Sequence, residues 1–218
     1  TPEQEIILET HSVFAFSIKQ MDINADGNME FIYLRSSKIQ VCENTGDSAW
    51  QKIYIINEFS SDIITDFAFG DVNDDGFDDI IYSPYSGIKK IRVLINPTDN
   101  SSNWEEIILT EEARTVIGVF DINTDGWNDI IYEDVTTHIN YYKNNSGEFT
   151  ESVLIYNPTY TLTLFKTADI DLDGDIDIVG HFNSTGTLFF KNQGDGTVNT
   201  TIISSDFYEH QLAVDDFD

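Results

Sequence analysis

The 218-residue chain contains a single cysteine, Cys42, so its fold cannot depend on an internal disulfide bond. It lacks any apolar run of about 18 residues, which excludes direct insertion into a membrane as a helix. Basic residues are also scarce, because 11 Lys and Arg stand against 39 Asp and Glu and give a formal net charge of -28. Nucleic acid and anionic membranes are therefore excluded as partners, since phosphate binding needs clustered cationic side chains. The excess of acidic side chains instead suggests divalent cations as ligands.

Helical periodicity is absent as well. Apolar residues make up 40% of the chain, enough to bury a substantial core, yet no segment shows the 3.6-residue repeat of an amphipathic helix. The apolar residues form short runs, such as Ile80-Ile81-Tyr82, separated by Gly, Asn and Asp. This pattern is typical of strands and turns, and it predicts an all-β protein.

An Asp-rich motif of nine residues recurs along the sequence. Its four complete copies begin at Asp22, Asp71, Asp121 and Asp169, which lie 49, 50 and 48 residues apart. A fifth copy begins at Asp216, and the sequence ends inside it. A nearly constant period of this length indicates a repeat architecture.

Each repeat contains four predicted strands within about 48 residues, the size of one β-propeller blade. The alternative is a β-helix of calcium-binding nonapeptides, whose repeats are far shorter. We therefore expect one β-propeller region over residues 1–218, with four-stranded blades at about 10–59, 60–109, 110–157 and 158–205 and an incomplete fifth repeat at 206–218. Residues 3–9 are predicted to form a lone outer strand. The chain is thus expected to be part of a larger ring, and its open ends to self-associate or bind a partner chain.

The nine-residue motif has the spacing of a calcium loop. Alternate residues of a tight loop can direct oxygen atoms at one point, and Ca²⁺ takes six to eight such ligands. Positions 1, 3, 5 and 9 offer side-chain oxygens, Gly at position 6 permits the turn, and position 7 offers its carbonyl oxygen. The predicted ligands are Asp22, Asn24, Asp26, Asn28 and Glu30; Asp71, Asn73, Asp75, Phe77 and Asp79; Asp121, Asn123, Asp125, Trp127 and Asp129; and Asp169, Asp171, Asp173, Asp175 and Asp177.

Asp, Asn and Gly also form ordinary polar turns, which is the simpler interpretation of any single copy. Four copies at constant spacing favour a metal, because closely packed carboxylates repel one another without a cation. Calcium is favoured over magnesium, which prefers to keep its waters, and the loops lack the Cys and His that zinc or copper would select. The loop from Asp169 has four carboxylates where the others have three, which predicts that it binds calcium most tightly.

These loops resemble FG-GAP repeats, also described as VCBS-type repeats, of integrin α-subunit propellers, bacterial surface proteins and fungal lectins. Phe69-Gly70-Asp71 matches the Phe-Gly element of that family. The resemblance implies a propeller, typically of seven blades, with calcium in the loops that join the first and second strands. Glu30 departs from the pattern, because the other loops have Asp at that position.

No catalytic constellation is predicted, so the chain is not expected to be an enzyme. His11, His138, His181 and His210 occupy non-equivalent positions in the repeat, and none stands beside a nucleophile. Tyr85, in a longer loop, is a candidate contact for a ligand because an amphipathic ring suits a sugar or a protein surface.

We expect a calcium-stabilised, secreted or cell-surface module for binding or adhesion. Millimolar extracellular calcium suits weak sites of this kind. The expected partner is a carbohydrate or a cell-surface protein. The alternative is the propeller domain of a secreted polysaccharide-degrading enzyme.

Overall fold

The computed structural model describes residues 15–35, 38–44, 46, 50–58, 64, 66–84, 89–98, 103–205 and 212. All regular secondary structure in these residues is β-strand, which confirms the all-β prediction. None of them forms a helix long and apolar enough to cross a membrane. The strands are β1 (Ala15–Met21), β2 (Glu30–Arg35), β3 (Lys38–Asn44), β4 (Trp50–Glu58), β5 (Phe67–Gly70), β6 (Asp79–Tyr82), β7 (Lys90–Ile95), β8 (Glu105–Phe120), β9 (Asp129–Asp134), β10 (Ile139–Asn145), β11 (Glu148–Tyr156), β12 (Leu162–Ala168), β13 (Asp177–Phe182), β14 (Gly186–Asn192) and β15 (Val198–Ser204).

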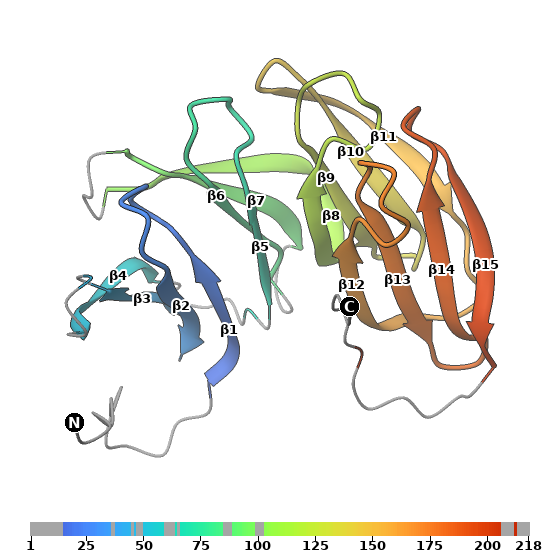
Figure 1. The fold of residues 1–218 in the computed structure, drawn as a ribbon, viewed down its shortest axis with the longest axis horizontal. Coiled ribbons are helices and arrows are strands. Elements are labelled where there is room, and N and C mark those ends of the chain that lie inside the picture. Colours follow the sequence, from blue (N-terminus) through green and yellow to red (C-terminus); the bar gives the residue numbers. More distant parts are fainter. Residues whose placement is uncertain are drawn as a thin grey trace.

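Consecutive strands pair antiparallel, and within the described residues they form four units (Figure 1). Unit 1 is β1–β4, and unit 4 is β12–β15. Unit 2 contains β5, β6, β7 and the first half of β8, whereas unit 3 contains the second half of β8 with β9, β10 and β11. Short polar turns connect most of the strands, so that neighbours in sequence are neighbours in the sheet.

The long strand β8 belongs to two units. Its residues 105–112 pair with β7, and residues 113–120 pair with β9. Units 2 and 3 consequently form one seven-stranded sheet, with the order β11-β10-β9-β8-β7-β6-β5. The boundary expected between residues 109 and 110 lies inside this strand.

The apolar core lies between the units. One cluster joins the facing surfaces of units 1 and 2, with Ile32 and Val41 packed near Ile80 and Tyr82. A second cluster joins units 2 and 3, and a third joins units 3 and 4. Because each sheet buries one face against the next sheet, a single unit could not bury its apolar residues alone.

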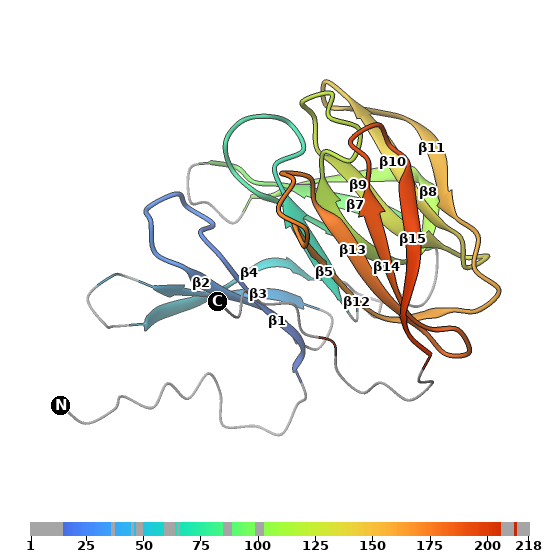
Figure 2. The ribbon, with the colours of Figure 1, turned by 45° about the vertical axis from the view of Figure 1, so that its right-hand side comes forward.

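The first strands of neighbouring units lie side by side. Ser17 Oγ on β1 donates a 2.8 Å hydrogen bond to Asp66, directly before β5. Gly70, at the end of β5, lies so close to β8 that an added Cβ atom would be 2.7 Å from a methyl carbon of Val119. The turned view shows the successive sheets facing one another (Figure 2).

The loops that follow these first strands all lie at the same end of the fold, the upper end in Figure 1. The described strands form no closed sheet. The lone strand expected at residues 3–9 and, apart from residue 212, the incomplete repeat at 206–218 lie outside the described residues.

Candidate functional site

The four Asp-rich loops share one backbone conformation. We number them 1 to 4, over residues 22–30, 71–79, 121–129 and 169–177. Gly at position 6 has φ between 86° and 99° in every loop. Position 4 is also left-handed although it is never glycine, with φ of 54° to 60° at Ala25, Asp74, Thr124 and Leu172. Four different side chains hold the same strained backbone, so the conformation is imposed by the rest of the loop.

Side-chain oxygens at positions 1 and 5 fix this conformation. In loop 2, Asp71 accepts hydrogen bonds from the backbone N–H groups of Asp75 (3.3 Å) and Gly76 (2.8 Å). Asp75 in turn accepts one from the N–H of Phe77 at 2.9 Å. The corresponding three bonds occur in each of the other loops. The expected ligands at positions 1 and 5 therefore line the inside of a tight turn.

The acid at position 9 is buried in every loop. Asp79, Asp129, Asp177 and Glu30 begin the second strands and are 0% exposed. Asp79 accepts hydrogen bonds from the N–H groups of Val72 (3.1 Å) and Asn96 (2.8 Å). Burial is the largest effect on these carboxyl groups, and it raises the pKa of Asp79 and of Asp129 to about 6. Neighbouring loop carboxylates raise them further, so a cation in the loop would stabilise the charged form.

The donor set of the loops fits a hard divalent cation. In loop 4, Asp169, Asp171 and Asp177 each present a carboxylate oxygen, and these oxygens lie within 4.8 Å of one another. Loops 1 to 3 have Asn instead of Asp at position 3, so each combines an amide oxygen with three carboxylates. Oxygen ligands of these types suit Ca²⁺, and no Cys or His stands in any loop.

Two loops also contact a lysine. Lys191 on β14 pairs with Asp171 and, at 2.9 Å, with Asp173 of loop 4. Lys143 on β10 pairs with Asp125 of loop 3 at 3.4 Å. Each lysine directly precedes an asparagine, which is Asn144 on β10 and Asn192 on β14. The prediction of calcium affinity from the number of carboxylates did not take these lysines into account.

Loops 1 to 3 are each joined to the next unit through the carbonyl oxygen of position 2. The Asn96 side chain donates to Ile23 at 2.9 Å, and the Asn144 side chain donates to Val72 at 2.8 Å. In unit 4 a backbone donor replaces the asparagine, and the Gly196 N–H donates to Ile122 at 3.1 Å. The loops are therefore part of the contacts between units.

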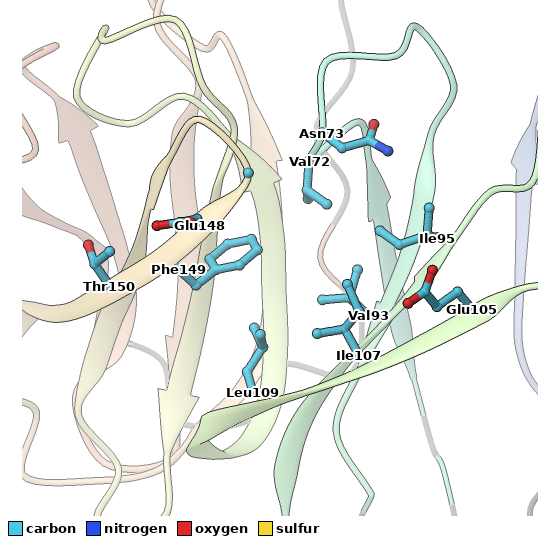
Figure 3. A pocket seen from close by; sticks show the side chains of 11 residues that line it. Val72, Asn73, Val93, Ile95, Glu105, Ile107, Leu109, Glu148, Phe149 and Thr150 are labelled. Carbon is cyan, nitrogen blue, oxygen red and sulfur yellow. The ribbon is translucent and has the colours of Figure 1, made fainter.

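A pocket of about 560 Å³ lies between units 2 and 3, beside loop 2 (Figure 3). Apolar side chains form most of its wall, and Phe149 points into it from β11. Polar groups surround these apolar residues, and the whole lining is Val72, Asn73, Val93, Ile95, Glu105, Ile107, Leu109, Gly147, Glu148, Phe149 and Thr150. Asn73 is also the predicted ligand at position 3 of loop 2. This pocket was not predicted from the sequence.

A difference in turn length explains why the corresponding place between units 3 and 4 is filled. Five residues, 193–197, separate the paired Asn192 and Val198, whereas four residues, 145–148, separate the paired Asn144 and Phe149, so the turn before Phe149 is one residue shorter. The longer turn lies against loop 3, where Thr124 Oγ1 donates to the Gly194 carbonyl at 2.7 Å. An added Cβ atom on Gly196 would be 2.6 Å from the Tyr141 hydroxyl, which shows how closely this turn packs. The shorter turn leaves space for a ligand beside loop 2.

The other candidate residues are spread over the fold. Tyr85, the predicted ligand contact, lies outside the described residues, as do His11 and His210. His138 pairs with Asp134 at 3.4 Å in the turn between β9 and β10. His181 is buried and lies 3.0 Å from the Thr187 hydroxyl. The structure does not bring these two histidines into the loops or the pocket.

Among the solved structures that match is a lectin from Agrocybe aegerita, described for its specific recognition of non-reducing terminal N-acetylglucosamine. The TM-score is 0.60 at 16% sequence identity, which shows similarity of fold. The match covers 88% of this chain and 53% of the lectin, so the chain spans about half the length of that protein.

A search of curated proteins gives no match. The family described as FG-GAP-like repeat matches residues 22–82 and 121–180, more than half of the chain. The matched segments begin at the first residues of loops 1 and 3 and extend past loops 2 and 4, so the shared pattern is the one that forms the loops. The chain belongs to the FG-GAP-like repeat family.

Proposed function

We propose that this chain is a calcium-stabilised, non-catalytic binding module that recognises a carbohydrate outside the cell. The observation that carries the proposal is the fourfold recurrence of a loop with the same left-handed positions and the same three hydrogen bonds. An ordinary polar turn does not require a buried acid. Each of these loops, however, has a buried acid at position 9, close to the other carboxylates of the loop. A bound cation offsets the repulsion that this arrangement creates.

The residues that would hold calcium are those at positions 1, 3, 5 and 9, with the carbonyl oxygen of position 7. The ion would supply positive charge at the point where these oxygens meet. Because position 2 of a loop contacts the next unit, an ordered loop would also hold that contact in place. Extracellular calcium, at about millimolar concentration, is sufficient to fill sites of this class.

Calorimetric titration and thermal unfolding test the calcium proposal. We expect Ca²⁺ to bind the purified chain and to raise its Tm, and a chelator to lower it, because a ligand that binds only the folded state stabilises that state. Mg²⁺ at the same concentration serves as the control and should have a smaller effect. A chain that neither binds Ca²⁺ nor changes its Tm in millimolar calcium would refute this part of the proposal.

We further propose that the four units are blades of a β-propeller ring of about seven. Their adjacent first strands and the burial of each sheet against the next are the packing that blades require. The far face of unit 4 carries apolar residues, and Ile203 there is 57% exposed. We expect residues 1–218 alone to self-associate through such open faces or to bind a partner chain. Light scattering that shows a monomer at all concentrations would argue against this.

The pocket between units 2 and 3 is the proposed carbohydrate site. Its mixture of an aromatic ring, apolar walls and rim groups such as Asn73, Glu105 and Glu148 suits a sugar, which presents both C–H faces and hydroxyl groups. The likeness in fold to a carbohydrate-binding lectin supports this ligand class. Val72 and Asn73 belong to loop 2, so we expect binding to depend on calcium.

A glycan array, probed with and without chelator, tests the ligand class. Thr150→Trp should fill the pocket and abolish the binding, whereas Glu151→Trp on the same strand should not. Binding that both variants retain would remove the pocket from the site. The same glycans should be recovered intact, and their hydrolysis by the purified chain would overturn the non-catalytic assignment.

A further inference from the structure

Loops 3 and 4 differ from loops 1 and 2 in the charge that faces them from the neighbouring strand. Lys143 and Lys191 precede Asn144 and Asn192, whose backbone N–H groups donate 2.8 Å hydrogen bonds to Asp129 and Asp177. These bonds fix the register of β10 and β14 against the loops. The lysine side chain at this position consequently extends along the loop and reaches its acids.

The corresponding residues in the first two units are not cationic. Glu43 precedes Asn44 in unit 1, and Ile95 precedes Asn96 in unit 2, where it lines the pocket. The four loops therefore have the same oxygen donors at most positions but differ in the local charge. In loop 4 the ammonium group of Lys191 offsets the extra carboxylate of Asp171, with which it pairs.

We infer that Lys143 and Lys191 are built-in counter-cations that lower the calcium affinity of loops 3 and 4. This rests on the proposed calcium binding. An ammonium group beside the acids repels a divalent cation bound by the same acids, and it also competes for their oxygens. The effect cancels the advantage in calcium affinity that the carboxylate count alone predicts for loop 4.

Loop 3 offers a site-specific measurement, because Trp127 occupies its position 7. Terbium ions bind calcium sites and luminesce when a nearby indole ring is excited. Trp127→Phe identifies the signal from loop 3 and should be tolerated, because Phe77 occupies the same position in loop 2. Displacement of this terbium signal by Ca²⁺ then gives the calcium affinity of loop 3 in the full chain.

Lys143→Met should raise the calcium affinity of loop 3 by roughly 3- to 10-fold, the effect of one unit charge on a divalent ion a few ångströms away in salt solution. Lys143→Arg retains the charge and should keep the affinity low. The matched control is Lys166→Met, which removes an exposed lysine on β12 that has no contact with the loops among the described interactions. A higher affinity in Lys143→Met alone supports the inference.

Equal effects of Lys143→Met and Lys166→Met, or a lower affinity in Lys143→Met, would overturn the inference and leave the calcium proposal intact. The lower affinity would mean that the lysine positions the carboxylate of Asp125 instead of competing with the ion. Absence of terbium and calcium binding in the wild-type chain would reject the calcium proposal itself, and the inference with it. For loop 4, calorimetry of Lys191→Met should show one calcium site becoming tighter by a similar factor.

Discussion

The side-chain amide of Asn144 donates a 2.8 Å hydrogen bond to the carbonyl oxygen of Val72, which lies 72 residues earlier in the chain. The same amide donates to the carbonyl of Asn128 at 2.9 Å, and the backbone N–H of Asn144 donates to Asp129. A single buried residue thus connects loop 3 of its own unit to loop 2 of the preceding one. Unit packing and loop conformation are therefore coupled.

Replacing Asn144 with Ala should destabilise the chain by about 2–4 kcal/mol, because the buried carbonyl of Val72 and the partly buried carbonyl of Asn128 lose their hydrogen-bond donor. Asn145→Ala, an exposed change at the next position, should cost less than about 1 kcal/mol. Urea unfolding followed by fluorescence measures both. Equal midpoints for the two variants would show that the contact between the units contributes little.

Gly70→Ala should lower the free energy of unfolding by about 1–3 kcal/mol, as overpacking of a close contact does. The added methyl group would lie 2.7 Å from a methyl carbon of Val119 and 3.2 Å from its carbonyl oxygen, and a branched residue on a paired strand has little room to move. Unit 4 has Ala168 at the corresponding position, so Ala168→Gly is a suitable reverse control. An unchanged Tm for Gly70→Ala would contradict the close packing of β5 against β8.

Glu133 gives a pH-dependent prediction that does not involve the loops. Its carboxylate is buried, accepts a hydrogen bond from the Leu162 N–H and pairs with Arg114 at 3.3 Å. Burial nevertheless raises the pKa of Glu133 above its usual value. The folded state then holds this proton more tightly than the unfolded state does, so the contribution of Glu133 to stability falls as pH rises through its folded-state pKa.

The variant Glu133→Gln, which cannot titrate, should consequently gain stability relative to the wild type as pH rises from 4 to 8. Glu133→Ala should instead lose about 1–3 kcal/mol at every pH, since the Leu162 N–H is left without its acceptor. Thermal unfolding across this pH range separates the two variants. A difference between Glu133→Gln and the wild type that does not change with pH would contradict the raised pKa.

Cys42 should react slowly with thiol reagents while the chain is folded. The side chain is 3% exposed on β3, and burial raises the pKa of the thiol, which reduces the fraction present as reactive thiolate. Labelling at pH 8 should be slow in buffer and become rapid in urea, in parallel with unfolding. Rapid labelling of the native chain would indicate that unit 1 opens easily.

The Asp-rich loops could be located from the sequence because their chemistry is local. The spacing of Asp121, Asn123, Asp125 and Asp129 within nine residues already predicts one tight turn, whereas the burial of the acid at position 9 is seen only in the structure. The strands followed from the short apolar runs between loops. The ligand class, the number of blades and Tyr85 as a ligand contact stay predictions, because these local patterns do not contain that information.

Contacts between units could not be predicted in the same way. Asn144 appears in the sequence as the end of a strand, and only the packing of units shows that it reaches Val72. The pocket depends on a turn that is one residue shorter than its counterpart in unit 4. The sequence shows this difference in length, but it does not show that both turns lie against a loop. Likewise, only the register of β14 against loop 4 shows that Lys191 pairs with Asp173.

The unbroken course of β8 leaves no linker between units 2 and 3. Residues 105–120 form one strand paired with β7 and then with β9, so a protease finds no loop there, whereas residues 157–161 between units 3 and 4 are not in a strand and include the exposed Tyr160. A cut at the border of the sequence repeats, between residues 109 and 110, would split a strand that both units need, so we expect recombination to gain or lose units 2 and 3 together.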